Sequence, residues 1–296
     1  MSDTVEMQNI RGLDIDKTVK GYALVEYIFK NDCTVTGFTG DAVRWYQENA
    51  TELNPTSPQI IENISPLSNF TMLEENWTRN TSYVRKYGVE GFISMEDIKT
   101  ADIDVLARSL LRLTRAVVRK VDARIFSVMS DGYPAAQVVS TSINSNAATA
   151  AWNTASFTSV DIILDLMQGK LNLWNNGYNP EGATLFLSPL DYKNLVTYLI
   201  SVKGSSIPAF ASDRVATGTV LQILGLNVKV SPNVTASGAL IVVPKVSCTW
   251  KSHTDTTSRL IEDPGLGTKI RVWEEGEALL TDPKSVNLIY NTQTHA

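Results

Sequence analysis

The 296-residue sequence contains little of what most catalytic and metal sites are built from. It has only two histidines and two cysteines, and it has neither a cysteine pair with metal-ligand spacing nor a His-Glu-x-x-His motif, which argues against the common zinc sites. A Gly-x-Ser-x-Gly elbow and a Gly-Lys-Ser/Thr phosphate loop are also missing, and Gly265-Leu-Gly267 lacks the rest of a dinucleotide fingerprint. His253 and Asp255 resemble a base with its orienting acid, but a solvated loop histidine is the favoured interpretation. The sequence predicts no enzyme, no cofactor and no metal site.

Long apolar runs and a basic excess are missing as well. The apolar runs, such as residues 239–244, are far shorter than the ~20 residues of a membrane-spanning helix, and the first residues do not resemble a signal peptide. We therefore expect no membrane partner. The net charge is −5 and the isoelectric point about 5.2, so any contact with nucleic acid is expected to be weak and non-specific. Cys33 and Cys248 are interpreted as two free thiols in a reducing compartment.

The first part of the chain does not look able to bury its own surface. Residues 1–40 are interpreted as an extended arm with a short helix near residues 19–30. Two strand-like segments follow, residues 41–48 and 81–93, with a stretch rich in proline and asparagine between them. Together they indicate a long two-stranded projection with an irregular tip. Because an isolated hairpin is only marginally stable in water, it is expected to pack on a partner.

The strongest periodic signal is a helix expected at about residues 98–128. Apolar residues recur every three or four positions from Ile103 to Val121, and the pattern stops at Asp131-Gly132. At ~1.5 Å per residue the helix would be about 45 Å long. An arginine stripe lies on the opposite face: Arg108, Arg112, Arg115 and Arg119. This stripe is either a solvated face paired with acids of the same subunit, or a face directed at nucleic acid or at carboxylates of a neighbouring subunit.

The remainder mixes helices and strands. Residues 133–156 are rich in small polar residues and are interpreted mostly as loop. Two further helices are expected to start at residues 158–161 and 188–191, each with Ser or Thr as the cap and an acid three residues later, and residues 183–187 between them form a strand pattern. Further strands are predicted at 226–230, 239–243, 268–273 and 285–290. The fold class is therefore α+β.

The order of these features resembles the Hong Kong ninety-seven fold of tailed-virus major capsid proteins, a fold that encapsulins share. The segments that carry the resemblance are residues 37–46 for the start of the extended loop, 84–95 for its return strand, 106–131 for the spine helix, 161–167 and 179–192 for the axial helix–strand–helix, and 224–230 and 273–280 for later strands. Each segment is a loose pattern, so the resemblance depends on their order and spacing along nearly the whole chain.

The resemblance implies a division of the chain and a set of contact residues. It implies an N-terminal arm at 1–40, an extended β-hairpin loop at 41–93, the spine helix of the peripheral domain at 94–130, an axial domain at 131–245 and peripheral-domain strands at 246–296. The implied intersubunit contacts of the extended loop are Arg44, Trp45, Tyr46, Tyr83, Arg85 and Tyr87. Some relatives cross-link a lysine to an asparagine; Lys86 and Asn287 are present, but no cross-link is predicted.

The function implied by the resemblance is self-assembly. The chain is expected to be a major capsid protein of the virion, forming pentamers and hexamers of an icosahedral or prolate shell around the double-stranded DNA genome of a tailed virus. Portal, scaffolding and decoration proteins are further expected partners, and assembly is expected in the host cytoplasm. The alternatives are an encapsulin-like nanocompartment shell and, from another class, a soluble α/β hydrolase-like enzyme, against which the missing catalytic constellation argues.

Overall fold

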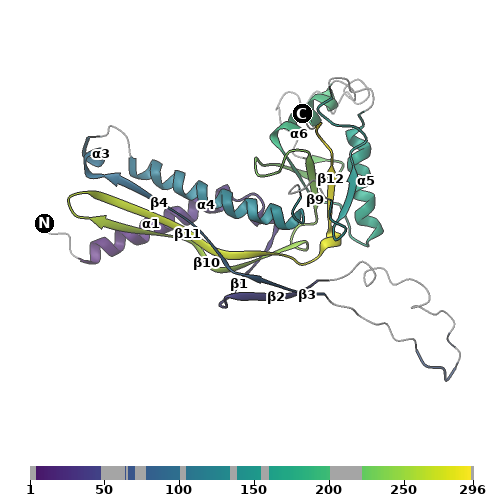
Figure 1. Ribbon diagram of the computed structural model, residues 1–296, viewed down its shortest axis with the longest axis horizontal. Coiled ribbons are helices and arrows are strands. Elements are labelled where there is room, and N and C mark those ends of the chain that lie inside the picture. The colour runs from purple at the N-terminus through teal and green to yellow at the C-terminus, as the bar shows by residue number, and fades with distance from the viewer. Residues whose placement is uncertain are drawn as a thin grey trace. The chain divides into compact units, whose positions relative to one another are not determined.

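The computed structural model divides the chain into two compact units, and we describe each by itself (Figure 1). The first unit comprises residues 1–43, 81–125 and 250–278, and the second comprises residues 44–80, 126–249 and 279–296. The structure describes residues 5–47, 64, 66–70, 78–100, 105–133, 139–154, 160–200 and 222–294.

The first unit is built on a four-stranded sheet in the order β1-β10-β11-β4. Its strands are β1 (Thr34–Gly37), β10 (Cys248–Asp263), β11 (Gly267–Leu280) and β4 (Arg85–Ser94). β11 and β4 are antiparallel, with Gly267 opposite Ser94 and Gly276 opposite Arg85. The strand predicted at 268–273 is thus part of a longer one, which forms a hairpin with β10. The helix α4 (Val105–Met129) packs closely on this sheet, because a Cβ added to Gly91 would lie 3.0 Å from the Leu113 Cδ1 atom.

α4 confirms the predicted long helix and its end. Its described part starts at Val105, a short helix α3 (Met95–Thr100) precedes it, and residues 101–104 lie outside the described residues. After the helix, Asp131 adopts a left-handed conformation with φ 49° and Gly132 follows with φ 82°. The Gly132 N–H donates to the Ser127 carbonyl at 2.8 Å, which is a C-terminal capping bond.

The N-terminal arm differs from the prediction. It contains a 22-residue helix, α1 (Val5–Glu26), followed by a 3-10 turn at Lys30–Asp32, so the short helix expected near residues 19–30 was wrong in both bounds. The apolar cluster that suggested it includes Tyr27 and Phe29, which are buried beyond the helix end. The backbone leaves the helix there because a side chain, that of Asp122, accepts from the Ile28 N–H at 2.8 Å.

The extended loop also divides differently. β2 (Ala42–Gln47) pairs with β3 (Thr78–Tyr83), but the predicted return strand at 81–93 is interrupted between β3 and β4, and β4 pairs with β11. β4 is the edge strand of the sheet of the first unit, and its alternate, more buried residues lie on one face of that sheet. At Gly91 this face lies close to Leu113 of α4. Residues 48–63, 65 and 71–77 of the predicted loop lie outside the described residues.

The second unit contains a six-stranded mixed sheet in the order β5-β12-β9-β6-β8-β7. Its strands are β5 (Asn144–Ala147), β12 (Val286–Tyr290), β9 (Gly238–Val242), β6 (Thr184–Leu187), β8 (Leu226–Val230) and β7 (Gln222–Ile223). The described part of residues 133–156 is mostly loop, as predicted, apart from the short strand β5. β12 pairs with β9 and β5, so the last strand belongs to this unit and not with the peripheral strands expected throughout 246–296.

Two helices share the core of this sheet. α5 (Ile162–Asn175) and α6 (Pro189–Tyr198) contribute to one apolar cluster with buried residues of β6, β9 and β12. The cap of α5 is Asp161, which accepts from the Leu164 N–H at 3.2 Å; the expected cap at residue 158 lies outside the described residues. The predicted start of α6 is confirmed, because the Ser188 hydroxyl accepts from the Asp191 N–H at 3.1 Å.

Candidate functional site

The arginine stripe lies on the exposed face of α4. Arg108, Arg112, Arg115 and Arg119 are all exposed, whereas Leu110, Val117 and Val121 are buried. Arg115 pairs with Glu26 of α1 across 2.7 Å between Nε and Oε1. Arg115 is thus held by an acid of the same subunit, and the stripe places a row of positive charge on the exposed face of α4.

The inner face of α4 holds a buried acid that ties the arm to the helix. The Asp122 carboxylate accepts from the Ile28 N–H at 2.8 Å and from the Lys30 N–H at 3.3 Å. Burial raises the pKa of Asp122 to about 6, although these backbone donors act in the opposite direction. Asp122 therefore accepts the hydrogen bonds that helical carbonyl groups would otherwise accept from these N–H groups. The cost is that its charge is removed from water.

Glu274 of β11 forms a second attachment point for the arm. It is fully buried and lies 2.6 Å from the Lys30 ammonium group and 2.9 Å from the Thr256 hydroxyl. The Tyr27 hydroxyl donates to the same carboxylate, and burial, followed by the charge of Glu274, raises the pKa of Tyr27 above its usual range. Further up α1, the Asp16 carboxylate accepts from the Ser258 N–H at 2.8 Å. The arm is therefore fastened to its own subunit from Asp16 to Lys30.

A third buried carboxylate, Glu277, interacts with one arginine of β4 and one arginine of α4. Arg85 lies 3.4 Å from it, and Arg124 of α4 donates to it through Nε at 3.2 Å. Tyr87 lies nearby with its ring centroid 6.4 Å from that of Trp250, and burial followed by the charge of Glu277 raises the pKa of Tyr87 to about 12. Arg85 and Tyr87, predicted as intersubunit contacts, thus make their described contacts within the subunit.

The other predicted loop residues lie on β2 and β3 and are mostly exposed. Arg44, Tyr46 and Tyr83 are exposed. Trp45 is half-buried, and its indole N–H donates to the Leu280 carbonyl at 3.1 Å, beside the bond from the Gln47 side chain to the same oxygen at 2.9 Å. Tyr46 and Tyr83 therefore keep large side chains exposed on this strand pair.

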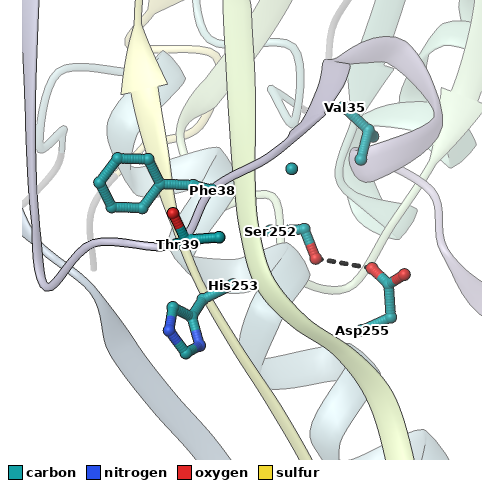
Figure 2. Close-up of a pocket in the computed structure, with 7 residues that line it drawn as sticks. Val35, Phe38, Thr39, Ser252, His253 and Asp255 are labelled. Carbon is teal, nitrogen blue, oxygen red and sulfur yellow. Dashed lines mark hydrogen bonds between the residues drawn. The ribbon is translucent and has the colours of Figure 1, made fainter.

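The candidate base and acid do not form a pair. The Asp255 carboxylate accepts from the Ser252 hydroxyl at 2.6 Å, and the His253 Nδ1 atom lies 3.2 Å from the Glu275 carboxylate. Figure 2 shows the His253 ring and the Asp255 side chain pointing in different directions at a surface pocket of about 510 Å³. The pocket is lined by Val35, Gly37, Phe38, Thr39, Ser252, His253 and Asp255. The geometry does not support base catalysis by this pair.

A metal site and a membrane-spanning helix are both absent from the described part of the chain. Within the described ranges, no group of three or more His, Cys, Asp or Glu side chains could hold a metal ion. In the same part of the chain, no helix is long and apolar enough to cross a membrane. Cys33 and Cys248 are both buried thiols that are not joined in a disulfide.

Sequence reasoning missed the three buried carboxylates, although two of them left a signal. Asp122 follows Val121 directly on the apolar face of the predicted helix. Glu274 shares the alternation of Ile270 and Val272, which places it on the buried face of the strand. An acid in a buried register is a sign of a paired or hydrogen-bonded charge.

Taken together, these features define a Hong Kong ninety-seven-type capsid fold, with a fastened arm, a strand-pair projection, a long spine helix and two sheets. The family model described as phage capsid protein matches residues 79–286, which is more than half of the chain. The chain belongs to this phage capsid protein family, and its function is that of a structural protein of the virion shell.

Solved structures support the fold at low sequence identity. The capsid of cyanophage P-SCSP1u matches with a TM-score of 0.65 and 13% identity, covering 90% of this chain and 89% of that chain. The mature capsid of bacteriophage PhiM1 gives 0.64 and 13%, with coverage of 91% and 88%. A virus-like particle from Pyrococcus furiosus gives 0.62 and 10%, with coverage of 94% and 99%. A search of curated proteins gives no match.

Proposed function

We propose that the chain is the major shell subunit of a tailed virus and that it assembles into pentamers and hexamers of an icosahedral or prolate head around double-stranded DNA. The family match over residues 79–286 carries this proposal. It is supported by the coverage of about nine tenths of the chain by structures of phage capsids. Assembly takes place in the host cytoplasm, with portal, scaffolding and decoration proteins as further partners and without enzymatic activity.

Assembly proceeds by mass action through many weak and symmetric interfaces. Quasi-equivalent rings require segments that adapt to different surroundings, and the extended loop and the part of the arm outside its fastened stretch take this role. The fastening of the arm from Asp16 to Lys30 supports a division of labour in which this stretch stays with its own subunit. On the loop, the exposed rings of Tyr46 and Tyr83 are the kind of side chain that anchors protein interfaces.

The arginine stripe is assigned to contact with packaged DNA or with carboxylates of a neighbouring subunit. The exposure of all four arginine residues on one helix face supports this role. Since Arg115 is already paired with Glu26, Arg108 and Arg112 are the best candidates. The net charge of −5 limits such contact to weak and non-specific binding.

Electron microscopy of the purified recombinant protein, with light scattering on the same sample, tests the proposed function. Closed polyhedral shells, or rings of five or six subunits, are the expected result. A monodisperse monomer or dimer under all conditions, including added crowding agent, would contradict the proposal.

A nanocompartment shell of the same fold is the second candidate. It is supported by the match to the virus-like particle from Pyrococcus furiosus, which covers 94% of this chain. The contents of particles purified from the natural source separate the two functions. Double-stranded DNA inside supports the viral head, whereas an enclosed protein without a genome supports the compartment.

A further inference from the structure

The exposed face of α5 in the second unit is apolar. Four large side chains are spaced by three, four and three residues and therefore lie on one side of the helix. They are Leu164, Met167, Leu171 and Trp174, with exposed fractions of 55%, 39%, 45% and 45%. We call these four residues the α5 stripe; it extends over eleven residues, or about 15 Å of helix.

The charges of α5 point inward. Its only two charged residues, Asp165 and Lys170, are almost completely buried. The Asp165 carboxylate accepts from the Thr149 N–H at 2.8 Å and from the Trp152 indole N–H at 2.8 Å. The Lys170 ammonium group donates to Glu181 and to the Leu224 carbonyl, both at 2.7 Å. A surface helix normally has the reverse polarity, with charges outside.

The rest of the exposed face carries no charge either. Gln168 and Asn175 are the other exposed positions of α5, and both are amides. Covering this face with another protein therefore desolvates no ion, and it removes four apolar side chains from water. Contiguous apolar surface of this kind marks an interaction site.

The fold prevents α5 from burying the stripe within its own unit. The opposite side of the helix packs on the sheet through Ile162, Leu166 and Leu173, which are fully buried. At Gly169 the approach is so close that a Cβ would lie 2.7 Å from the Ile241 Cδ1 atom. Rotating the helix would force larger side chains into that contact, so the stripe can be covered only from outside.

We propose that the α5 stripe is an interface between copies of this chain within a ring, an inference that rests on the proposed function. A second copy is the occupant because a shell subunit meets its own kind at every interface of a ring. A membrane surface fits poorly, because helices that lie on membranes carry basic residues beside the apolar face, and the exposed face of α5 has none. Ring closure joins two different patches, so the stripe packs on a surface of the neighbour other than its α5.

Leu171→Glu tests this interface, because it places a charge at the middle of the stripe without touching the core. The expected result is a folded subunit with unchanged circular dichroism and an assembly yield at least tenfold below that of the parent at equal concentration. Val246→Glu is the matched control. Val246 lies in the same unit with a similar exposed fraction, 42% against 45%, and this variant should assemble like the parent.

A second measurement detects coverage of the stripe directly. Cys33 and Cys248 are fully buried, so in Leu171→Cys a polar maleimide should label position 171 alone. Labelling should be at least tenfold slower in rings or shells than in dissociated subunits, whereas labelling of Val246→Cys should change far less.

The outcomes separate the inference from the proposed function. If the parent forms neither rings nor shells, the proposed function fails and the inference fails with it. If the parent assembles and Leu171→Glu assembles equally well, or if Leu171→Cys is labelled at the same rate in both states, only the inference is overturned. This holds whether the stripe then proves to bind another protein or a lipid surface.

Discussion

The helices α4 and α5 turn opposite faces to their surroundings. α4 exposes an arginine stripe and buries Val117 and Val121, whereas α5 exposes Leu171 and Trp174 and buries both of its charged residues. α4 separates apolar from basic residues around its axis, whereas α5 has apolar residues on both faces, so the spacing of apolar residues alone does not distinguish their exposed faces. The polarity of the exposed residues does distinguish them. The exposed face of α4 suits contact with water, acids or phosphates, and the exposed face of α5 suits contact with protein.

The difference also predicts where charge matters for stability. An exposed charge interacts through water and contributes little to folding. A buried charge must be compensated, and removing either the charge or its partners leaves unsatisfied groups in the interior. Changes to the inward charges of α5 should therefore affect folding strongly, whereas changes to the outward charges of α4 should leave the fold intact and affect binding.

The largest effect is expected for Asp165→Ala. This change leaves the Thr149 N–H, the Thr149 hydroxyl and the Trp152 indole N–H without their common acceptor. The free energy of unfolding should fall by about 3–5 kcal/mol. Urea unfolding of unassembled subunits at pH 7 measures it. Gln168→Ala on the exposed side of the same helix should change it by less than about 1 kcal/mol; equal effects of the two variants would contradict the comparison.

The acid on the inner face of α4 should give a pH-dependent effect. In the folded protein the pKa of Asp122 is about 6, above its ordinary value of 3.8, so the folded state binds the proton more tightly than the unfolded state. The contribution to stability is therefore full below pH ~4 and is lost as pH rises through 6, a decline of about 3 kcal/mol. Asp122→Asn should abolish this part of the pH dependence.

Urea unfolding of parent and Asp122→Asn subunits between pH 4 and pH 7 measures this decline. Burial also raises the pKa values of Asp191 and Asp282. Their contributions are present in both proteins, so the difference between the two curves isolates Asp122. Parallel curves would mean that Asp122 does not bind a proton in this range.

The contrast between α4 and α5 was only half visible in the sequence. α4 could be predicted because its apolar and basic residues separate cleanly around the helix. In α5 apolar residues occur all around, so that Met167 is exposed although its neighbour Leu166 is fully buried. Which face is inside depends on packing at Gly169 and Ile241, residues far apart in the chain.

Long-range pairing explains the other differences. β4 pairs with β11 across about 180 residues of sequence, and no local pattern in residues 81–93 distinguishes that partner from β2. The end of α1 likewise depends on Asp122, which lies 94 residues from Ile28. The candidate contact residues Arg44, Tyr46 and Tyr83 were identified through resemblance, and their role in binding stays a prediction.

A smaller effect is expected when the exposed charge of α4 is removed. Arg108→Gln with Arg112→Gln should leave the free energy of unfolding nearly unchanged. If both side chains contact phosphate, the salt dependence of binding of assembled rings to double-stranded DNA should weaken by about one power of salt concentration per arginine. The yield of DNA-filled particles should then fall more than that of empty ones; equal losses of both would favour contact with a neighbouring subunit.

The smallest effect is expected for the ion pair between Arg115 and Glu26. The two side chains lie 2.7 Å apart, but Arg115 is more than half exposed and Glu26 about one third exposed, so water and salt screen the interaction. A double-mutant cycle with Arg115→Gln and Glu26→Gln, measured by urea unfolding, should give a coupling energy below about 1 kcal/mol that shrinks in 0.5 M salt. A coupling as large as the loss in Asp165→Ala would show that outward charges on α4 stabilise the fold as strongly as inward charges on α5, and the assignment of the arginine stripe to binding would lose its physical basis.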